Sequence, residues 1–293
     1  MYDEYEFAID DISIARGEDM ATEFPADLRI IAERDGLIRA VYEDWTILCA
    51  SERRQYLDLV SQLAHGTYPA PVKEFTKTYR SHVVLIAPKG EKIIFKLSRR
   101  ERFIFLRHLR TLIKDSEAFE TLRSTRRLHK MGLLEIYNPF LAMEKRRWNM
   151  IEATILLYDY VEGPDCAEYG EASVPLVVKA LKKCHAMGCR HSDATPKNFI
   201  IHDGQVKMID SRFKRNVLGR FGEYCDFMRL EEKLPAVGKY LAFDRGSPPY
   251  VAARIYRLVK RDRTVRLIKE MKRNWRSRRF ESQQEIHESG SYI

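Results

Sequence analysis

The segment HSDATPKNFIIHDGQVKMID, residues 191–210, constrains the fold of this chain more than any other stretch. Two short apolar runs, 199–201 and 206–209, flank an Asp-Gly dipeptide, which is a strong signal for a β-hairpin turn. A hairpin brings its two outer ends together. We therefore expect Asn198, just before the first strand, to lie beside Asp210, just after the second.

Oxygen-bearing side chains gather at this predicted junction. Asp193 precedes Asn198 in the loop that leads into the hairpin, and it brings a second carboxylate towards Asp210. Mg²⁺ prefers hard oxygen ligands of this kind, usually a few carboxylates together with substrate phosphates. The pattern favours a site that holds metal and phosphate over a solvated turn rich in Asp and Asn.

Composition places the chain among globular proteins. Of its 293 residues, 45% are hydrophobic and 32% are charged, and no apolar run approaches the ~20 residues of a membrane span. The acidic N-terminus lacks the basic-then-apolar order of a secretory signal, so we expect a cytoplasmic protein. The cysteines have no metal-binding spacing and are expected to be reduced structural thiols: Cys49, Cys166, Cys184, Cys189 and Cys225.

Hydrophobic periodicity predicts where helices and strands alternate along the chain. Apolar residues spaced three and four apart favour helices over 24–45 and 50–66. Residues 82–98 predict a β-hairpin. Two helices, 101–113 and 116–132, follow it, and Ser116 is a suitable N-cap for the second. Further expected elements are strands over 136–147 and 152–163 and a helix over 174–188, followed by a mainly helical region.

This order of elements predicts an α+β fold with two lobes. The N-lobe is expected to be small and rich in strands, and the C-lobe larger and mainly helical, with an extra helical segment at the N-terminus. The predicted boundaries are 1–70 for the helical extension, 71–163 for the N-lobe, 164–280 for the C-lobe and 281–293 for a polar tail.

The motif His-x-Asp-x-x-x-x-Asn, followed about a dozen residues later by Ile-Asp, resembles the catalytic loop and metal-binding aspartate of the protein-kinase-like fold. The resemblance implies that Asp193 accepts the proton of an attacking hydroxyl. It also implies that Asn198 and Asp210 hold the Mg²⁺ ion that bridges the phosphates of ATP. Asp226, on a following helix, resembles the aspartate that orders the catalytic loop, although an ordinary aspartate near a helix N-terminus is an equal alternative.

The nucleotide side of the resemblance lies upstream. Lys96, at the end of KIIFK, stands where the family places the lysine that contacts the α- and β-phosphates. Its glutamate partner is expected on the next helix region, at Glu120, with Glu117 as the second candidate. The segment ILLYDYVEG resembles the hinge that carries adenine, which implies backbone contacts from Asp159 to Val161.

The chain also departs from protein kinases. It has no glycine-rich phosphate loop and no Ala-Pro-Glu activation segment, and Ser-Arg follows Asp210 in place of Phe-Gly. Phosphate cradling would then fall to other groups, such as Thr76, Thr78 or Ser81. These departures favour a kinase of small molecules or glycolipids over a regulated protein kinase.

One family matches these features best. The strings FLAMEKR, YDYVEG and HSD…P-x-NFII…G-x-VKMID, followed by basic SRFKR, resemble the bacterial lipopolysaccharide core heptose kinases over about residues 75–245. The resemblance implies ATP-dependent phosphorylation of a heptose on a lipid-linked core oligosaccharide acceptor. The alternatives are an atypical protein or small-molecule kinase of the same fold and a pseudokinase that acts as a binding module. The sequence indicates no oligomeric state.

Two basic segments, 99–110 and 254–279, interleave Lys and Arg with apolar residues. Such helices can lie on an anionic bilayer surface, here the cytoplasmic face of the inner membrane, or can pack on a core with a solvated back. Nucleic-acid binding is disfavoured, because no base-reading module is present and aromatic residues are sparse among the cations.

Overall fold

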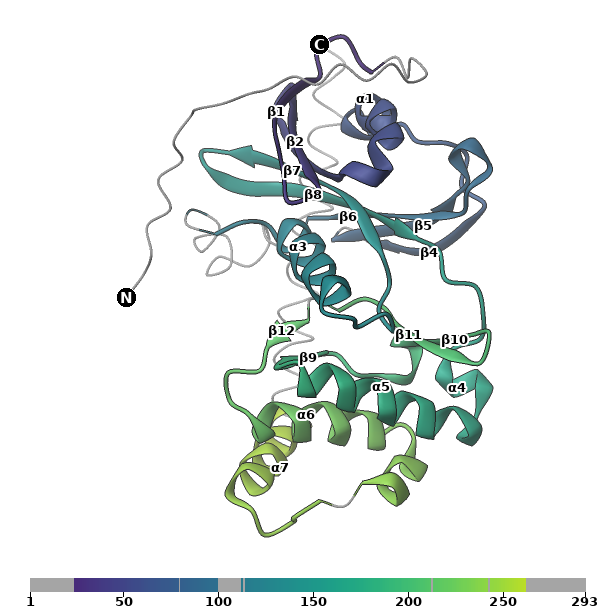
Figure 1. Cartoon of the computed structure of the whole chain (residues 1–293), viewed down its shortest axis with the longest axis vertical. Coiled ribbons are helices and arrows are strands. Elements are labelled where there is room, and N and C mark those ends of the chain that lie inside the picture. The colour runs from purple at the N-terminus through teal and green to yellow at the C-terminus, as the bar shows by residue number, and fades with distance from the viewer. Residues whose placement is uncertain are drawn as a thin grey trace, which may run out of the picture.

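The computed structural model describes residues 24–78, 80–99, 112, 114–211, 213–241 and 243–261. Figure 1 shows a sheet-rich upper half and a helical lower half. The fold is therefore mixed α and β, as predicted, with one large antiparallel sheet and several helices. The predicted helix over 101–113, the polar tail and residues 1–23 fall outside the described residues, apart from position 112.

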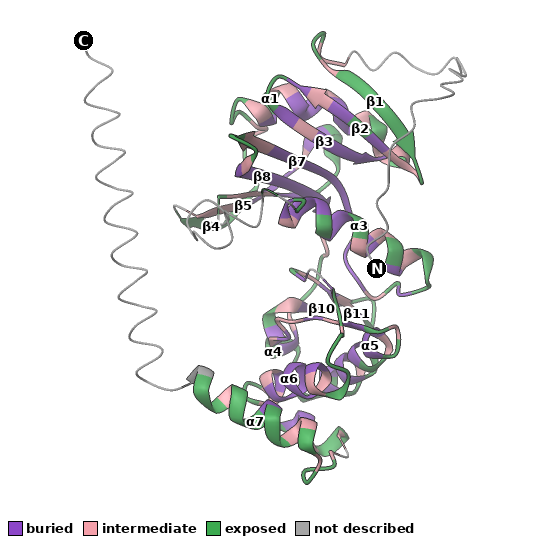
Figure 2. Ribbon diagram, turned by 90° about the vertical axis from the view of Figure 1, so that its left-hand side faces the viewer, coloured by how far each residue is buried: buried purple, intermediate pink, exposed green. Residues whose placement is uncertain are grey.

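Eight strands form the large sheet, in the order β1-β2-β3-β7-β8-β6-β5-β4. Their bounds are β1 (Arg29–Arg34), β2 (Leu37–Tyr42), β3 (Trp45–Ala50), β4 (Lys73–Thr78), β5 (Ser81–Ile86), β6 (Ile93–Ser98), β7 (Pro139–Arg147) and β8 (Met150–Asp159). Neighbouring strands in this sheet are antiparallel. The two edge strands, β1 and β4, are exposed along their whole length, whereas β7 and β8 at the centre are largely buried (Figure 2).

The helices lie mainly in the lower half. They are α1 (Val60–Ala64), which follows the 3-10 helix η1 (Ser51–Leu59), α3 (Glu117–Lys130), α4 (Cys166–Tyr169), α5 (Val174–Ala186), α6 (Arg220–Glu231) and α7 (Pro248–Arg261). Short 3-10 helices lie at η2 (Pro88–Gly90), η3 (Glu171–Ser173), η4 (Pro196–Asn198) and η5 (Pro235–Tyr240). Two small sheets complete the fold: β9 (Cys189–Arg190) pairs with β12 (Lys214–Arg215), and β10 (Phe199–His202) pairs with β11 (Gln205–Met208).

The prediction of a helical N-terminal segment was wrong for residues 29–50, which form the meander β1-β2-β3. Tight turns at Asp35-Gly36, with φ of 56° and 76°, and at Glu43-Asp44 reverse the chain. β3 then pairs with β7, whose residues lie far along the sequence, so the sheet continues across the predicted boundary at residue 70. Tertiary pairing therefore overrides the local helical pattern, and between residues 24 and 70 helix forms only over residues 51–64.

The sheet buries a separate cluster on each face. On one face, η1 and α1 cover the strands, and Tyr56, Phe95 and Phe140 are almost fully buried there. On the other face, α3 and the lower half pack against the sheet in a second cluster that includes Leu122 and Phe199. The cysteines are buried and free, as predicted. In the part of the chain that the structure describes, no helix has the length and apolar content needed to cross a bilayer.

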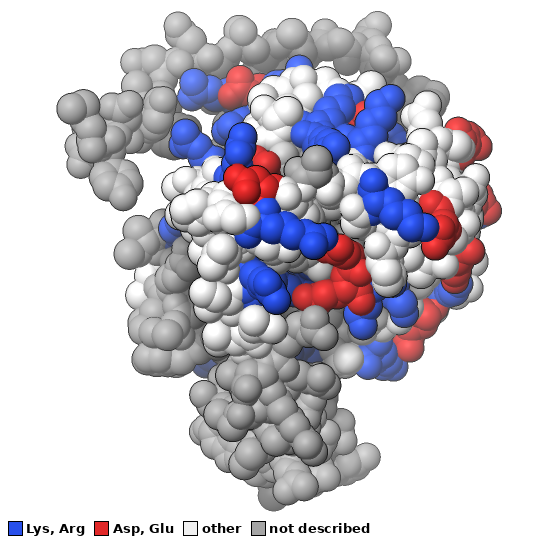
Figure 3. All heavy atoms as spheres, turned by 90° about the horizontal axis from the view of Figure 1, so that it is seen from below, with Lys and Arg blue, Asp and Glu red and all other residues white. Residues whose placement is uncertain are grey.

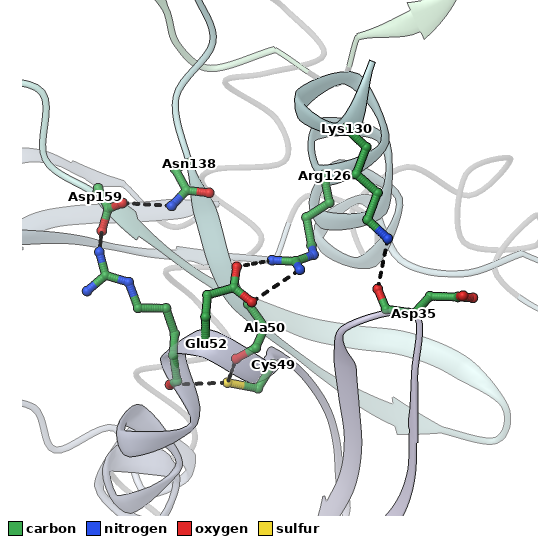
Figure 4. Close-up of polar contacts among 9 residues, drawn as sticks. Asp35, Cys49, Ala50, Glu52, Arg126, Lys130, Asn138 and Asp159 are labelled. Atoms are coloured by element: carbon green, nitrogen blue, oxygen red, sulfur yellow. Dashed lines mark hydrogen bonds and ion pairs between the residues drawn. The ribbon is translucent and has the colours of Figure 1, made fainter. Parts of the chain in front are cut away.

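Helix α3 is fixed at both ends. Ser116 caps its N-terminus, as predicted, because its hydroxyl accepts the Phe119 backbone N–H at 3.2 Å. Near its other end, Arg126 forms an ion pair with Glu52 of η1, and Lys130 donates to the backbone oxygen of Asp35, in the turn between β1 and β2, at 3.1 Å (Figure 4). These contacts tie α3 to the N-terminal strands and so fix its position against the sheet.

Candidate functional site

The hairpin β10–β11 forms as predicted. Its strands pair in register from Phe199↔Met208 to His202↔Gln205, and the turn residues Asp203 and Gly204 have φ of 49° and 70°. A backbone hydrogen bond from Ile209 N–H to the Asn198 oxygen, 2.9 Å long, closes the open end of the hairpin. Asn198 and Asp210 are therefore brought together, as the sequence predicted.

The loop before the hairpin is held by Asp226 of α6. Its carboxylate accepts the backbone N–H groups of His191 at 2.8 Å and Ser192 at 3.0 Å. Asp226 is 2% exposed, and His185 Nε2 lies 3.2 Å from its carboxylate. Ser192 has a φ of 69°, a left-handed conformation that is costly for a residue other than glycine. Charge-assisted hydrogen bonds offset this cost, so Asp226 orders the loop and is not merely a helix-terminal aspartate.

His191 supports the loop from within the core. Its ring lies 5.2 Å from the Phe199 ring and 5.7 Å from the Phe213 ring, between centroids. Burial lowers the pKa of His191 below its ordinary value, so the imidazole is neutral at physiological pH. Its role is packing, which leaves Asp193 as the titratable side chain that this loop offers to a substrate.

The three residues expected to handle phosphate and hydroxyl groups line one cavity of about 400 Å³. Lys96 enters it from β6, Asp193 from the loop, and Asp210 from the end of the hairpin. Lys96 Nζ forms an ion pair with the Asp210 carboxylate, which joins the sheet to the lower half. The full lining is Lys96, Ser98, Glu117, Ala118, Thr121, Tyr137, Thr154, Leu156, Arg190, His191, Ser192, Asp193, Asp210, Ser211, Lys214, Cys225, Asp226, Arg229, Tyr256 and Arg257.

Asn198 does not line this cavity, but its side chain contacts the loop that carries Asp193. Its Nδ2 donates to the Asp193 backbone oxygen at 2.8 Å, so its amide oxygen is the atom that remains suited to a cation. Among the described residues, no three His, Cys, Asp or Glu side chains cluster as a metal site. A cation here would take the Asn198 oxygen, the Asp210 carboxylate and substrate oxygens, a donor set that fits Mg²⁺.

The structure places Glu117, and not Glu120, at the cavity. Glu117 lies on the same side of α3 as Ala118 and Thr121, which also line the cavity. Glu120 is exposed and does not line it. Among the described residues, no ion pair joins Glu120 to Lys96, whose Nζ pairs with Asp210 instead.

The hinge residues lie outside the cavity lining. The Asp159 carboxylate accepts Asn138 Nδ2 at 2.8 Å and an Arg53 guanidinium N–H at 2.9 Å (Figure 4). This side chain is thus committed to the contact between η1 and β8. In the backbone of this segment, the N–H groups of Asp159 and Tyr160 donate to the Asn138 and Lys92 oxygens, each at 3.2 Å.

The suggested phosphate-cradling residues also lie outside the lining. Thr78 Oγ1 donates to the Ser81 oxygen and accepts the Ser81 N–H, both at 3.1 Å. Thr78 thus stabilises the tip of the β4–β5 hairpin. Thr76 is exposed on the edge strand β4.

Sequence reasoning missed a set of cations around Asp193. Arg229, one turn after Asp226 on α6, forms an ion pair with the Asp193 carboxylate. Arg190, Lys214 and Arg257 line the same cavity. The spacing of Asp226 and Arg229 could have revealed the arginine, because residues three apart on a helix share a face.

The chain was compared with protein families, curated proteins and solved structures. The family model described as lipopolysaccharide core biosynthesis protein (WaaY) matches residues 37–235, so it includes β2 and β3 of the meander. The lipopolysaccharide core heptose(II) kinase WaaY of Escherichia coli (strain K12) is 24% identical over 152 residues, which cover 49% of this chain and 63% of that protein. The solved structure of WaaP in complex with acyl carrier protein is 15% identical with a TM-score of 0.43, covering 76% of this chain and 95% of that chain.

The chain spans 63% of the length of its curated Escherichia coli relative. The family match is broader, and it extends over more than half of this chain, from β2 to just beyond the end of α6, so it includes most of the cavity residues. The chain therefore belongs to the WaaY family of lipopolysaccharide core biosynthesis proteins.

Proposed function

We propose that this protein is an ATP-dependent kinase that transfers phosphate to a heptose hydroxyl of the lipopolysaccharide inner core. The observation that carries the proposal is the single cavity that collects Lys96, Asp193 and Asp210. The sheet-rich and helical halves then correspond to the N-lobe and C-lobe of a kinase-like fold. The Escherichia coli relative, named as a heptose(II) kinase, supports the choice of acceptor.

The reaction forms a bond between the acceptor oxygen and the γ-phosphorus of ATP. The bond from that phosphorus to the bridging oxygen breaks, ADP leaves, and the hydroxyl proton passes to the Asp193 carboxylate. Asp226 keeps Asp193 in place by holding the backbone at Ser192. Catalysis of this kind depends mainly on positioning and on the neutralisation of phosphate charge.

Lys96 is the phosphate-binding group from the sheet, and Glu117 is the glutamate of α3 that lines the same cavity. When ATP is bound, Lys96 is expected to exchange its Asp210 partner for phosphate oxygens. Asn198 and Asp210 would hold Mg²⁺, which supplies positive charge to the phosphates when bound. The backbone from Asp159 to Val161 would carry the adenine, while the Asp159 side chain stays with Arg53 and Asn138.

The acceptor is lipid-linked, so the enzyme would work at the cytoplasmic face of the inner membrane. Helix α7 supports peripheral contact, because Val251, Ile255 and Leu258 are exposed along one side of it. Figure 2 shows that most of α7 is exposed. Arg254 is exposed on the same helix, and a cation beside an apolar stripe is typical of helices that bind anionic lipid surfaces.

The test is phosphate transfer from radiolabelled ATP to core oligosaccharide freed of lipid, with the product position determined by NMR. The proposal predicts transfer to a heptose hydroxyl. Transfer to protein serine, with none to the sugar, would instead identify a protein kinase. ATP binding without transfer to any acceptor would identify a binding module.

A further inference from the structure

Four basic residues from four different elements line the cavity on the side of the helical half. They are Arg190 on β9, Lys214 on β12, Arg229 on α6 and Arg257 on α7. Elsewhere on the helical half, the face in Figure 3 mixes lysine and arginine side chains with acidic ones among the described residues. The cavity therefore gathers cations from distant parts of the sequence.

Two of these cations are direct neighbours across a strand pair. Lys214 lies opposite Arg190 in the β9–β12 ladder. Like charges at opposite positions destabilise a strand pair. The cost is offset when an anion lies between them, so this arrangement suits a ligand with negative charge.

The fold makes room for Arg190. A Cβ atom added to Gly222 of α6 would clash with the Asn216 Oδ1 and lie 3.0 Å from the Arg190 Cδ, so the missing side chain of Gly222 leaves space for both side chains. Among the described residues, no acidic side chain forms an ion pair with the Arg190 guanidinium, although the cavity holds Asp193 and Asp210. Within the part of the chain that the structure describes, Arg190 therefore lies in the cavity without an acidic ion-pair partner.

Arg229 and Arg257 differ in how firmly they are held. Both oxygens of Glu232 accept from Arg257, whose side chain is 14% exposed, so Arg257 is anchored and contributes one edge of its guanidinium. Arg229 is 33% exposed and pairs with Asp193, which is 46% exposed. This second pair is accessible, and a stronger anion can take the place of Asp193.

We propose that Arg190, Arg229, Lys214 and Arg257 form a subsite for an acidic group that the acceptor carries near its reacting hydroxyl. The inference rests on the proposed function and adds the substrate class, an anionic sugar. Phosphate and carboxylate both satisfy this chemistry, and planar guanidinium groups bind either one through paired hydrogen bonds.

The subsite also links acceptor binding to the catalytic base. When an acidic group pairs with Arg229, Asp193 loses its arginine partner and becomes available to the hydroxyl. An acceptor without the acidic group would leave Asp193 paired with Arg229. The anionic sugar should thus be favoured in both binding and turnover.

The test compares one core oligosaccharide in three forms: phosphorylated, phosphatase-treated, and phosphatase-treated with its carboxylates reduced to alcohols. kcat and KM are measured for the wild type, Arg190→Gln and Arg229→Gln. Lys239→Gln is the matched control, because Lys239 is 73% exposed and pairs with Glu171 away from the cavity. Binding of each sugar is measured in parallel with a non-hydrolysable ATP analogue present.

We expect the wild type to favour acidic sugars over the neutral form by about tenfold to a hundredfold, as for the loss of a charge-assisted hydrogen bond. If phosphatase treatment alone removes the preference, the subsite recognises phosphate. If the preference disappears only after the carboxylates are reduced, the subsite recognises carboxylate. In Arg190→Gln and Arg229→Gln, the ratio of kcat/KM for acidic and neutral sugars should fall close to one, whereas Lys239→Gln should keep the wild-type ratio. Circular dichroism confirms that each variant is folded.

The inference is overturned if both arginine variants lose activity equally on acidic and neutral sugars, or if they weaken only ATP binding. In either case sugar kinase activity in the wild type would still stand. If acidic sugar binds through Arg190 and Arg229 but no phosphate is transferred, the subsite stands and the proposed kinase function fails. If the wild type neither binds nor phosphorylates the sugars, both proposals are rejected.

Discussion

The carboxylate of Asp226 holds the backbone N–H of Ser192 at 3.0 Å, and so fixes the residue that precedes Asp193 in a left-handed conformation. A second N–H, from His191, binds the same carboxylate at 2.8 Å. The position of Asp193 is therefore set by a buried charge on a helix that begins well after the hairpin. This relationship explains how a strained loop presents its aspartate without a substrate to hold it.

Replacing that charge tests the relationship. Asp226→Asn keeps the size of the side chain but weakens both charge-assisted bonds, so we expect the variant to lose about 1.5–3 kcal/mol of unfolding free energy per affected bond. Turnover should fall more than nucleotide affinity, because the loop and not the nucleotide site is disturbed. Urea unfolding and steady-state kinetics measure the two effects.

Asp244→Asn is the matched control, because Asp244 also accepts a backbone N–H, from Gly246 at 3.2 Å, but does so in an exposed loop. Asp244→Asn should change neither the free energy of unfolding nor the turnover. Equal effects of Asp226→Asn and Asp244→Asn would mean that the buried carboxylate has no special role in the catalytic loop.

A paired substitution on α3 separates the two candidate glutamates. Glu117→Gln removes a carboxylate that shares the cavity with Lys96, and we expect kcat/KM to fall on the order of tenfold to a hundredfold through misplacement of the lysine. Glu120→Gln, three residues later and exposed, should behave as the wild type. The reverse result in ATP-dependent kinetics would restore Glu120 as the functional residue.

Acid should weaken the contact between η1 and the sheet. Hydrogen bonds from Tyr56 and then from Arg53, at 2.7 Å each, hold the pKa of Glu91 below its ordinary value. A carboxyl group with a lower pKa in the folded state stabilises the protein fully above its unfolded pKa of about 4.3, and that contribution disappears as pH falls through the folded pKa. Glu91→Gln should therefore reduce the loss of thermal stability between pH 7 and the acid range.

The control for this experiment is Glu43→Gln. Glu43 lies in an exposed turn and pairs only with His65 among the contacts that the described residues make, at 3.3 Å. Thermal unfolding followed across pH compares the two variants. If Glu91→Gln and the wild type lose the same thermal stability between pH 7 and the acid range, Glu91 does not contribute to that loss.

Local signals carried the prediction of the hairpin and its loop. Asp203-Gly204 fixes a turn over a few residues, so the approach of Asn198 to Asp210 follows from neighbouring sequence alone. The N-terminal meander could not be predicted in the same way. The partner of β3 is β7, and the pairing depends on residues that lie far along the chain.

The same distinction applies within the site. Lys96 and Asp193 belong to motifs and were found from the sequence, and the structure places both in one cavity. Arg190 lies three residues before Asp193, but Arg229 and Arg257 belong to no motif, and only tertiary packing brings them to the cavity. Glu117 and Glu120 differ by less than one helical turn, so the choice between them needed the orientation of α3 against the sheet.

The most direct test of the central claim is single-turnover phosphate transfer from ATP to purified core oligosaccharide, measured for the wild type and Asp193→Ala. Nucleotide affinity is measured on the same samples. The wild type should phosphorylate a heptose hydroxyl. Asp193→Ala should still bind ATP but transfer phosphate about 10²–10⁴-fold more slowly, because a positioned general base usually contributes a factor of this size. Full transfer by Asp193→Ala, or a wild type that binds ATP but phosphorylates no sugar, would contradict the assignment.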